Sequence, residues 1–176
     1  FPCSIIFFDE IESLTQVDTK SQHAREIRSE LLRQIQGVDT YKGEDGKILY
    51  LIAATNKPWD IDPAFVRPGR FGTRVYVGLP DEDARRYMVT SKLDKMREMG
   101  IVTIGDDIDV DKIVEKTNGY NGADIDNVIN ECKEISIIRS VSTNEKIILQ
   151  EDFDKALEKI TSSVQPNDLK KLMMWK

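Results

Sequence analysis

Two adjacent carboxylates, Asp9 and Glu10, directly follow the apolar run Ile5–Phe8. Four consecutive apolar residues are typical of a strand that is buried on both faces of a sheet. In open α/β sheets, ligands bind in the crevice beyond the carboxyl ends of the strands. One acid at that place can hold a metal ion while the other handles water, which is the chemistry that nucleotide hydrolysis requires. Taken alone, the pair is equally typical of a helix N-terminus, where acidic side chains face the positive end of the dipole.

The phosphate loop that would complete such a site is absent, because no G-x-x-x-x-G-K-S/T pattern occurs in the sequence. The nearest run, Gly43–Lys47, has the wrong spacing and is typical of a polar turn. The sequence therefore contains half of a nucleotide site, and we expect that it begins inside a domain.

Length and composition exclude several classes of protein. The chain has 176 residues, of which 32% are charged, and its net charge of -6 argues against a broad basic surface for nucleic acid. Cys3, Cys132 and the single histidine, His23, supply too few ligands for a zinc site. Two thiols without a C-x-x-C pair are typical of a cytosolic protein, so we expect a cytoplasmic location. No apolar stretch approaches the roughly 20 residues of a membrane helix.

The first part of the chain is expected to form a parallel sheet. Continuous apolar strands that alternate with helices predict a parallel sheet covered on both faces. Three strands and one long helix cannot cover such a sheet, which again indicates that part of the domain lies upstream. The expected elements are strands at residues 4–8, 48–55 and 74–77, a helix from His23 to Gly37, a turn at 41–47 and a long loop at 57–72.

The remainder, from the boundary at Pro80 onward, is expected to be purely helical. Asp109 and Asn121 can each cap a helix, and Pro166 suits the first turn of the last one. We expect helices at about 82–99 and 110–116, a third with the apolar face Ile125, Val128, Ile129, Cys132 and Ile135, a fourth that carries Phe153, and the last from Pro166. The expected domains are 1–80 for the α/β part, 81–162 for the helical part and 163–176 for a C-terminal helix.

Four motifs, FFDEIESL, AATN, DPAFVRPGRF and GYNGADI, follow one another along the chain. Together they resemble the second half of an AAA ATPase domain, and the resemblance covers essentially the whole chain. It implies an α/β fold, with a partial P-loop NTPase parallel sheet that lacks the Walker A half, followed by an all-α helical lid subdomain. Trp59 and the ending SSVQPNDLKKLMMW are similar to the branch of katanin, spastin and the vacuolar-sorting ATPases, whereas RPGRF with Gly69 is similar to the proteasomal ATPases.

The resemblance implies ATP and Mg2+ as cofactors and gives roles to three residues at the strand ends. Asp9 matches the Walker B aspartate, which supports the magnesium ion between the β- and γ-phosphates. Glu10 matches the residue that orients the attacking water. Asn56 matches sensor 1, whose amide can hold the water or a γ-phosphate oxygen. Without the resemblance, a turn residue that ends a strand is an equally good interpretation of Asn56.

The resemblance also implies that Arg67 and Arg70 are arginine fingers, which reach the nucleotide of the neighbouring protomer and so require a ring, usually a hexamer. Guanidinium groups suit phosphate oxygens because they are planar and always charged. An unplaced arginine is more often a solvated loop residue, but the surrounding motif overrides that interpretation. Gly72 departs from the family pattern, which has aspartate there, and we expect looser placement of the fingers.

Two further segments match the family. Gly122 and Ala123 match the part of the lid that packs near adenine and ribose, where small residues permit close approach of the backbone. The alternative is that Asn121–Gly122 only begins a helix, and both can hold. Ala123 leaves no sensor 2 arginine at this position. Ser13–His23 matches a second pore loop, although its composition is also that of a simple solvated loop.

The function that the resemblance implies is ATP hydrolysis by a ring-forming homo-oligomer that remodels, disassembles or unfolds protein substrates through a central pore. We expect no nucleic acid partner and no membrane span. The alternative is a non-catalytic fragment or an inactive relative that acts as an assembly module. The five retained polar site residues argue against an inactive relative. In AAA domains the phosphate-loop strand lies between the strands that match Leu49–Ala54 and Arg74–Val77, so the isolated 176-residue chain is expected neither to bind ATP tightly nor to hydrolyse it.

Overall fold

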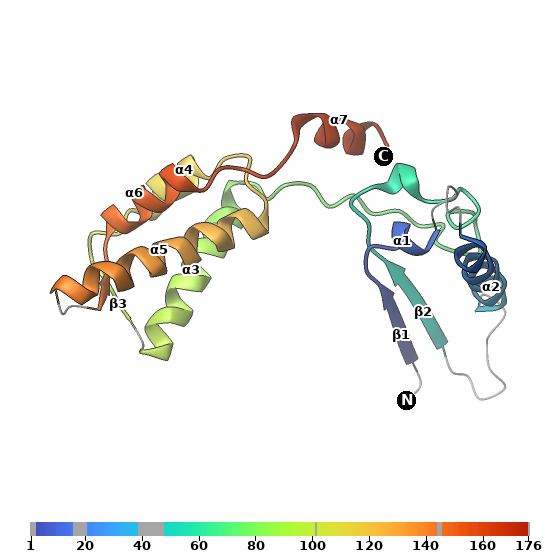
Figure 1. Ribbon diagram of the computed structural model, residues 1–176, viewed down its shortest axis with the longest axis horizontal. Coiled ribbons are helices and arrows are strands. Elements are labelled where there is room, and N and C mark those ends of the chain that lie inside the picture. Colours follow the sequence, from blue (N-terminus) through green and yellow to red (C-terminus); the bar gives the residue numbers. More distant parts are fainter. Residues whose placement is uncertain (1–2, 16–20, 39–47, 101, 144–145, 176) are drawn as a thin grey trace. The chain divides into compact units, whose positions relative to one another are not determined.

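The computed structural model describes residues 3–15, 21–38, 48–100, 102–143 and 146–175. It divides the chain into two compact units, drawn together in Figure 1 and described separately below. The strand unit comprises Phe1–Tyr76 and Leu169–Lys176, and the helical unit comprises Val77–Asp168. The expected turn at 41–47 and residues 16–20 of the expected pore loop lie outside the described residues.

The strand unit is built on two parallel strands. Strand β1 (Cys3–Phe8) pairs with β2 (Ile48–Ala53), and Phe8 lies opposite Ala53 at their carboxyl ends. These strands confirm the first two that the apolar runs predict, and the helix predicted from His23 is also present. The helices of this unit are α1 (Glu12–Thr15), α2 (Gln22–Val38) and the short 3-10 helix η1 (Pro58–Asp60).

The prediction of a third strand at Arg74–Val77 is wrong. The segment has no strand conformation, and its Val75 and Val77 side chains are 80% and 87% exposed. An extended segment becomes a strand only when a neighbour satisfies its backbone hydrogen bonds. Among the described residues, β1 and β2 pair only with each other, so no strand offers this segment a partner.

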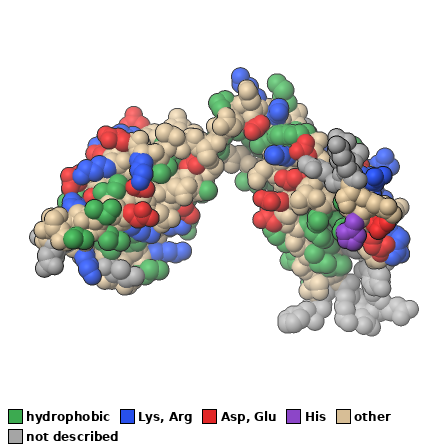
Figure 2. All heavy atoms as spheres, viewed as in Figure 1, with side chains coloured by type: hydrophobic (Ala, Val, Ile, Leu, Met, Phe, Trp, Pro, Cys, Tyr) green, Lys and Arg blue, Asp and Glu red, His purple; other side chains and the backbone are tan. Residues whose placement is uncertain are grey.

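One face of the two-stranded sheet is apolar and open. The parallel register places Ile5 opposite Tyr50 and Phe7 opposite Ile52, and all four side chains are exposed. Figure 2 shows hydrophobic side chains gathered on the surface over these strands. Continuous apolar patches of this kind mark surfaces that another segment or protein covers. The expectation that these elements cannot cover the sheet agrees with this exposure.

The end of the chain packs on the strand unit through two cation–π contacts. Helix α7 (Pro166–Met174) contributes Lys171, whose Nζ lies 5.2 Å from the centre of the Trp59 ring. The guanidinium of Arg74 in turn lies 4.7 Å from the centre of the Trp175 ring. A cation within about 6 Å of an aromatic face is attracted by the negative charge of that face. The two contacts hold the chain end beside the loop that follows β2.

Local capping chemistry sets the helix boundaries of the helical unit. The backbone N–H of Ala84 donates to Asp81 Oδ1 at 2.8 Å, and that of Lys112 donates to Asp109 Oδ1 at 3.0 Å. Gly100 ends the first helix with a φ of 63°, a conformation that glycine adopts without strain. The helices are α3 (Glu82–Met99), α4 (Val110–Lys116), α5 (Gly122–Thr143) and α6 (Gln150–Lys159).

The core of the helical unit lies between α3, α5 and α6. The face predicted on α5 is confirmed, because Ile125, Val128, Ile129 and Cys132 are at most 2% exposed and Ile135 packs against them. Phe153 of α6 and Leu93 of α3 complete the same cluster. The structure adds one feature that the helical pattern does not indicate, a parallel pair of two-residue strands, β3 (Thr103–Ile104) and β4 (Ile147–Ile148).

We expect the two cysteines of the native chain to differ in reactivity. Cys3 is exposed, whereas Cys132 is buried, and burial raises the pKa of the Cys132 thiol to about 12. Because thiolate is the reactive form, titration with a disulfide reagent at pH 8 should modify one thiol rapidly and the second only after denaturant is added. A folded pKa above the unfolded value contributes stability that is lost as pH rises from about 9 to about 12.

The control for this prediction is Cys132→Ala, in which the single remaining thiol should react fully without denaturant. Equal and immediate reaction of both thiols in the unaltered chain would contradict the prediction. Among the described residues, no helix is long and apolar enough to cross a membrane.

Candidate active site

The parallel pairing of β1 and β2 brings three of the predicted site residues to one edge of the sheet. The chain passes between the strand ends through two backbone hydrogen bonds, from Ala54 N–H to the Phe8 carbonyl at 2.8 Å and from Ile11 N–H to the Ala54 carbonyl at 3.1 Å. Asp9 and Glu10 follow β1 directly, and Asn56 follows β2. This edge is where parallel α/β sheets bind their ligands.

Asp9 and Glu10 are both exposed, and the backbone between them is constrained. Asp9 Oδ1 accepts a hydrogen bond from the Glu10 backbone N–H at 3.0 Å. Glu10 has a φ of 49°, in the left-handed region that residues other than glycine rarely adopt. Such strain persists only where the surroundings enforce it, and it is concentrated at functional sites. Here the Glu10 carbonyl accepts from Ser13 N–H at 2.9 Å, which fixes the turn into α1.

Asn56 lies in the bend that leads from β2 into η1, and its side chain is exposed. The preceding Thr55 Oγ1 accepts a hydrogen bond from Lys57 N–H at 3.0 Å, so the bend is closed around Asn56 without use of its amide. Pro58 then begins η1 and is buried. The Asn56 amide is therefore presented at the strand ends on a closed turn.

Arg67 and Arg70 occupy the two outer positions of a tight turn. The Arg70 N–H donates to the Arg67 carbonyl at 3.1 Å, and Gly69 has a φ of 83°. Proline at the first central position and a positive-φ glycine at the second form the pattern of a type II turn. The spacing of the two arginines thus follows from the chemistry of Pro68 and Gly69.

Aromatic side chains fasten this turn to the strand unit. Phe65 is fully buried, and its carbonyl accepts from the Phe71 N–H at 3.0 Å. The Phe71 ring packs edge-on against Phe8, the last residue of β1, with ring centres 6.1 Å apart. At Gly72, where the family pattern has aspartate, an added Cβ would lie 3.3 Å from Pro68 Cα. The glycine therefore lies closely against the turn that carries the arginines.

Gly122 and Ala123 belong to the helical unit, at the start of α5. Asn121 Oδ1 accepts from the Asp124 N–H at 2.8 Å, and Asp124 Oδ2 accepts from the Asn121 N–H at 3.1 Å, which forms a reciprocal cap. Asp124 Oδ2 also accepts from the Ser163 N–H at 3.2 Å. The cap predicted at Asn121 is confirmed, and Gly122 follows it directly.

The structure identifies one neighbour of Gly122 that the sequence pattern did not indicate. An added Cβ on Gly122 would lie 3.8 Å from Met88 Cε, on α3. Met88 is half-buried and packs against the core of the helical unit. Its pairing with Gly122 is a tertiary contact between residues 34 positions apart, which helical periodicity cannot predict.

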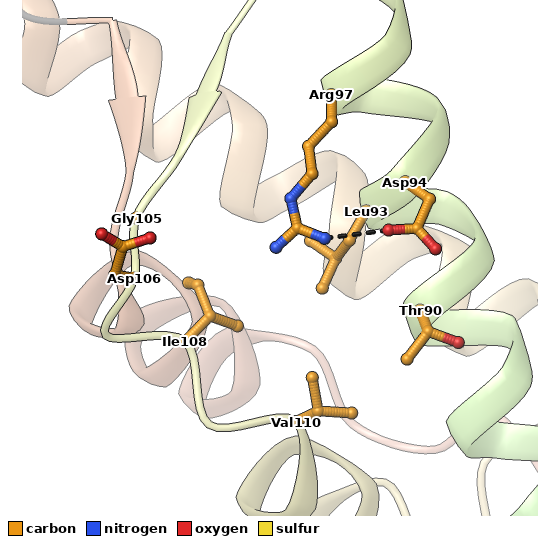
Figure 3. A pocket seen from close by; sticks show the side chains of 8 residues that line it. All are labelled: Thr90, Leu93, Asp94, Arg97, Gly105, Asp106, Ile108 and Val110. Atoms are coloured by element: carbon orange, nitrogen blue, oxygen red, sulfur yellow. Dashed lines mark hydrogen bonds and ion pairs between the residues drawn. The ribbon is translucent and has the colours of Figure 1, made fainter.

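A separate pocket of about 280 Å3 lies within the helical unit, and Figure 3 shows its lining. Leu93 on α3 lies across from Ile108 and Val110, which precede and begin α4, while Arg97 Nη1 donates to Asp94 Oδ1 at 2.8 Å at its rim. The pocket contains none of the site residues predicted from the sequence. Its charged pair is exposed and already satisfied, so the pocket offers no unpaired group to a ligand.

The donor set at the strand ends fits Mg2+ bound together with a nucleotide. Mg2+ takes one or two carboxylates and otherwise coordinates phosphate oxygens and water. Asp9 is an exposed carboxylate that uses Oδ1 within its own turn, and Oδ2 has no protein partner among the described residues. No group of three or more His, Cys, Asp and Glu side chains able to hold a metal gathers anywhere in the part of the chain that the structure describes. Asp9 is thus the one residue to which we would assign the metal.

Comparison with known proteins gives two matches to family models. Residues 2–79 match the ATPase family associated with various cellular activities (AAA), and residues 107–155 match the AAA+ lid domain. The chain is 38% identical to the A1 subunit of the katanin p60 ATPase of Strongylocentrotus purpuratus and 33% identical to that of Arabidopsis thaliana, over 98% of its length in each case. It is 37% identical over 97% of its length to the A-like 1 subunit of the katanin p60 ATPase of Danio rerio. The chain spans 35–37% of the length of these curated relatives.

Proposed function

Because the chain belongs to the AAA family of ATPases, we propose that its protein hydrolyses ATP at a site whose polar edge is formed by Asp9, Glu10 and Asn56. The observation that carries this proposal is the parallel register of β1 and β2, which ends both strands at the same edge and places these side chains there. The likeness to katanin p60 ATPases over nearly the whole chain supports it.

Each residue has a distinct task in the proposed reaction. Asp9 holds Mg2+ through its free carboxylate oxygen, and Glu10, fixed by its left-handed backbone, orients the attacking water. Asn56 holds the same water or a γ-phosphate oxygen through an amide that its own turn does not use. Bound Mg-ATP supplies the phosphoryl group, and the protein contributes positioning and charge stabilisation.

The arginine turn completes the proposed site from a neighbouring protomer. A guanidinium group supplied in trans neutralises the charge that develops on the transferred phosphoryl group. We propose a homo-oligomeric ring, a hexamer, in which Arg67 and Arg70 face the nucleotide of the next protomer. The substrate would be a protein that is remodelled or unfolded as it passes through the central pore, and the location would be cytoplasmic. The domain limits 1–80, 81–162 and 163–176 are part of the same proposal.

The decisive test is Glu10→Gln in the full-length protein. The variant should still bind ATP but should lose turnover by about 10²–10⁴-fold, because glutamine cannot orient and polarise water as a carboxylate does. Glu26→Gln on α2, an exposed glutamate outside the site, is the matched control and should leave turnover unchanged. Turnover that survives Glu10→Gln would contradict the proposal.

We expect that enlarging Gly122 weakens nucleotide binding without unfolding the lid. In Gly122→Val the added methyl groups project from the start of α5 towards Met88 and the surface proposed to face adenine. The Kd for ATP should rise about tenfold, as expected for about 1.4 kcal/mol of steric cost. Gly122→Ala is the control, because its Cβ would make only an ordinary 3.8 Å contact. Equal binding by all three proteins would contradict the assignment of Gly122.

A second candidate function, a non-catalytic assembly module, is supported by apolar side chains on the last turns of α5. Ile138 and Val141 are 72% and 86% exposed. Such a surface suits association with another protein. A full-length protein that assembles but neither binds nor hydrolyses ATP would favour this function over the first.

A further inference from the structure

Helix α2 contacts the loop that carries the arginine turn at two places. Arg28 Nη2 lies 3.1 Å from Asp62 Oδ2, and these side chains are only 24% and 13% exposed. Two turns further along α2, Gln36 Oε1 accepts a hydrogen bond from Arg70 Nη2 at 2.9 Å. At 1.5 Å per residue, the eight positions between Arg28 and Gln36 correspond to about 12 Å of helix. The loop is therefore tied at both ends to one rigid element.

The two arginines of the turn differ in their surroundings. Both terminal nitrogens of Arg70 are used within its own chain, since Nη1 donates to the Ala64 carbonyl and Nη2 donates to Gln36. Arg67 is exposed, and its guanidinium has no hydrogen bond or ion pair with any of the described residues. Only Arg67 is therefore available to a neighbouring nucleotide without the breaking of existing contacts.

We infer that Gln36 and Arg28 are positioning residues for the arginine turn, that Arg70 anchors the turn to α2, and that Arg67 is the guanidinium that reaches the neighbouring protomer. This inference rests on the proposed function, because it assigns parts to a turn that would complete an ATP site in trans. It divides between two residues a role that the family resemblance gives to both.

The energetic argument concerns placement of the Arg67 guanidinium. A guanidinium displaced by about 1 Å from the transferred phosphoryl group can cost about 10²-fold in rate. The Pro68–Gly69 turn fixes only the local backbone, so the direction of the whole turn depends on its anchors. Asp62 strengthens this dependence, because Oδ1 accepts from the Ala64 N–H at 2.8 Å while Oδ2 pairs with Arg28. The same carboxylate thus shapes the loop and binds it to the helix.

The test compares Gln36→Met with Gln36→Glu in the full-length protein. Methionine has a similar shape but no acceptor for Arg70, whereas glutamate keeps the acceptor oxygen. Gln36→Met should lower kcat about 10- to 100-fold with unchanged KM for ATP, and Gln36→Glu should restore it. Arg28→Met should act in the same direction. Gln34→Met is the matched control, because Gln34 bonds to Glu30 on its own helix and not to the loop.

Hydrogen–deuterium exchange supplies a second measurement that does not depend on turnover. Gln36→Met should speed exchange at the backbone amides of 64–71, and Gln36→Glu and Gln34→Met should not. A Gln36→Met protein with unchanged loop exchange or unchanged kcat, while Arg67→Ala inactivates the enzyme, would overturn this inference alone. If Arg67→Ala and Glu10→Gln both retain full turnover, the proposed function fails, and the inference fails with it.

Discussion

Replacement of Arg67 by alanine is expected to lower ATP turnover of the assembled protein by about 10³–10⁵-fold. The reason is the position of Arg67 on a fixed turn, at an exposed site without an intramolecular partner among the described residues. Loss of this cation would leave the charge on the transferred phosphoryl group without its neutralising partner. The measurement is steady-state hydrolysis, together with an ATP-binding assay that should change little.

Mixed assemblies distinguish an arginine that acts in trans from one that acts within its own protomer. Arg67→Ala and Glu10→Gln proteins should each be inactive alone. Their mixture should recover measurable turnover, because some interfaces then combine an intact Glu10 with an intact Arg67. Arg33→Ala, an exposed arginine of α2 that pairs with Glu30, is the control and should remain active. Inactivity of every mixture would contradict action between protomers.

The parts of this fold that the sequence predicts are those fixed by local chemistry. Asp81, Asp109 and Asn121 each cap a helix because a short acceptor side chain reaches the N–H groups of the first turn, whatever the rest of the chain does. The Pro68–Gly69 turn is likewise local, since Gly69 has the positive φ that the turn requires. The apolar strand endings locate Asp9 and Asn56 for the same reason.

The parts that the sequence does not predict depend on partners far along the chain. Arg74–Val77 has the composition of a strand but no strand to pair with among the described residues. The β3–β4 pair has two residues in each strand, too few for any periodic signal. The contact between Arg70 and Gln36 is similarly beyond a pattern-based prediction, because it joins surface polar residues 34 positions apart. These contacts determine how the candidate site is held.

The largest effect on stability is expected from Arg139→Met in the helical unit. Asp152 is fully buried, and Arg139 binds it with two nitrogens, Nη2 to Oδ2 at 2.8 Å and Nε to Oδ1 at 3.2 Å. Arg139 also donates to the Ile147 carbonyl, so it joins α5 to both β4 and α6. Removal of one partner of a buried ion pair leaves an uncompensated charge and costs about 3–5 kcal/mol. Urea unfolding followed by circular dichroism should show this loss for the helical unit.

The double variant Arg139→Met/Asp152→Leu separates the cost of an unpaired charge from the value of the pair itself. Replacement of both partners by apolar side chains of similar size is often nearly neutral, because no charge then needs solvation. The double variant should therefore be more stable than Arg139→Met alone. Arg97→Met, which breaks an exposed pair with Asp94, should cost about 0–1 kcal/mol. A single Arg139→Met variant that is as stable as Arg97→Met would contradict the prediction, and it would mean that α5 and α6 are held together by their apolar contacts alone.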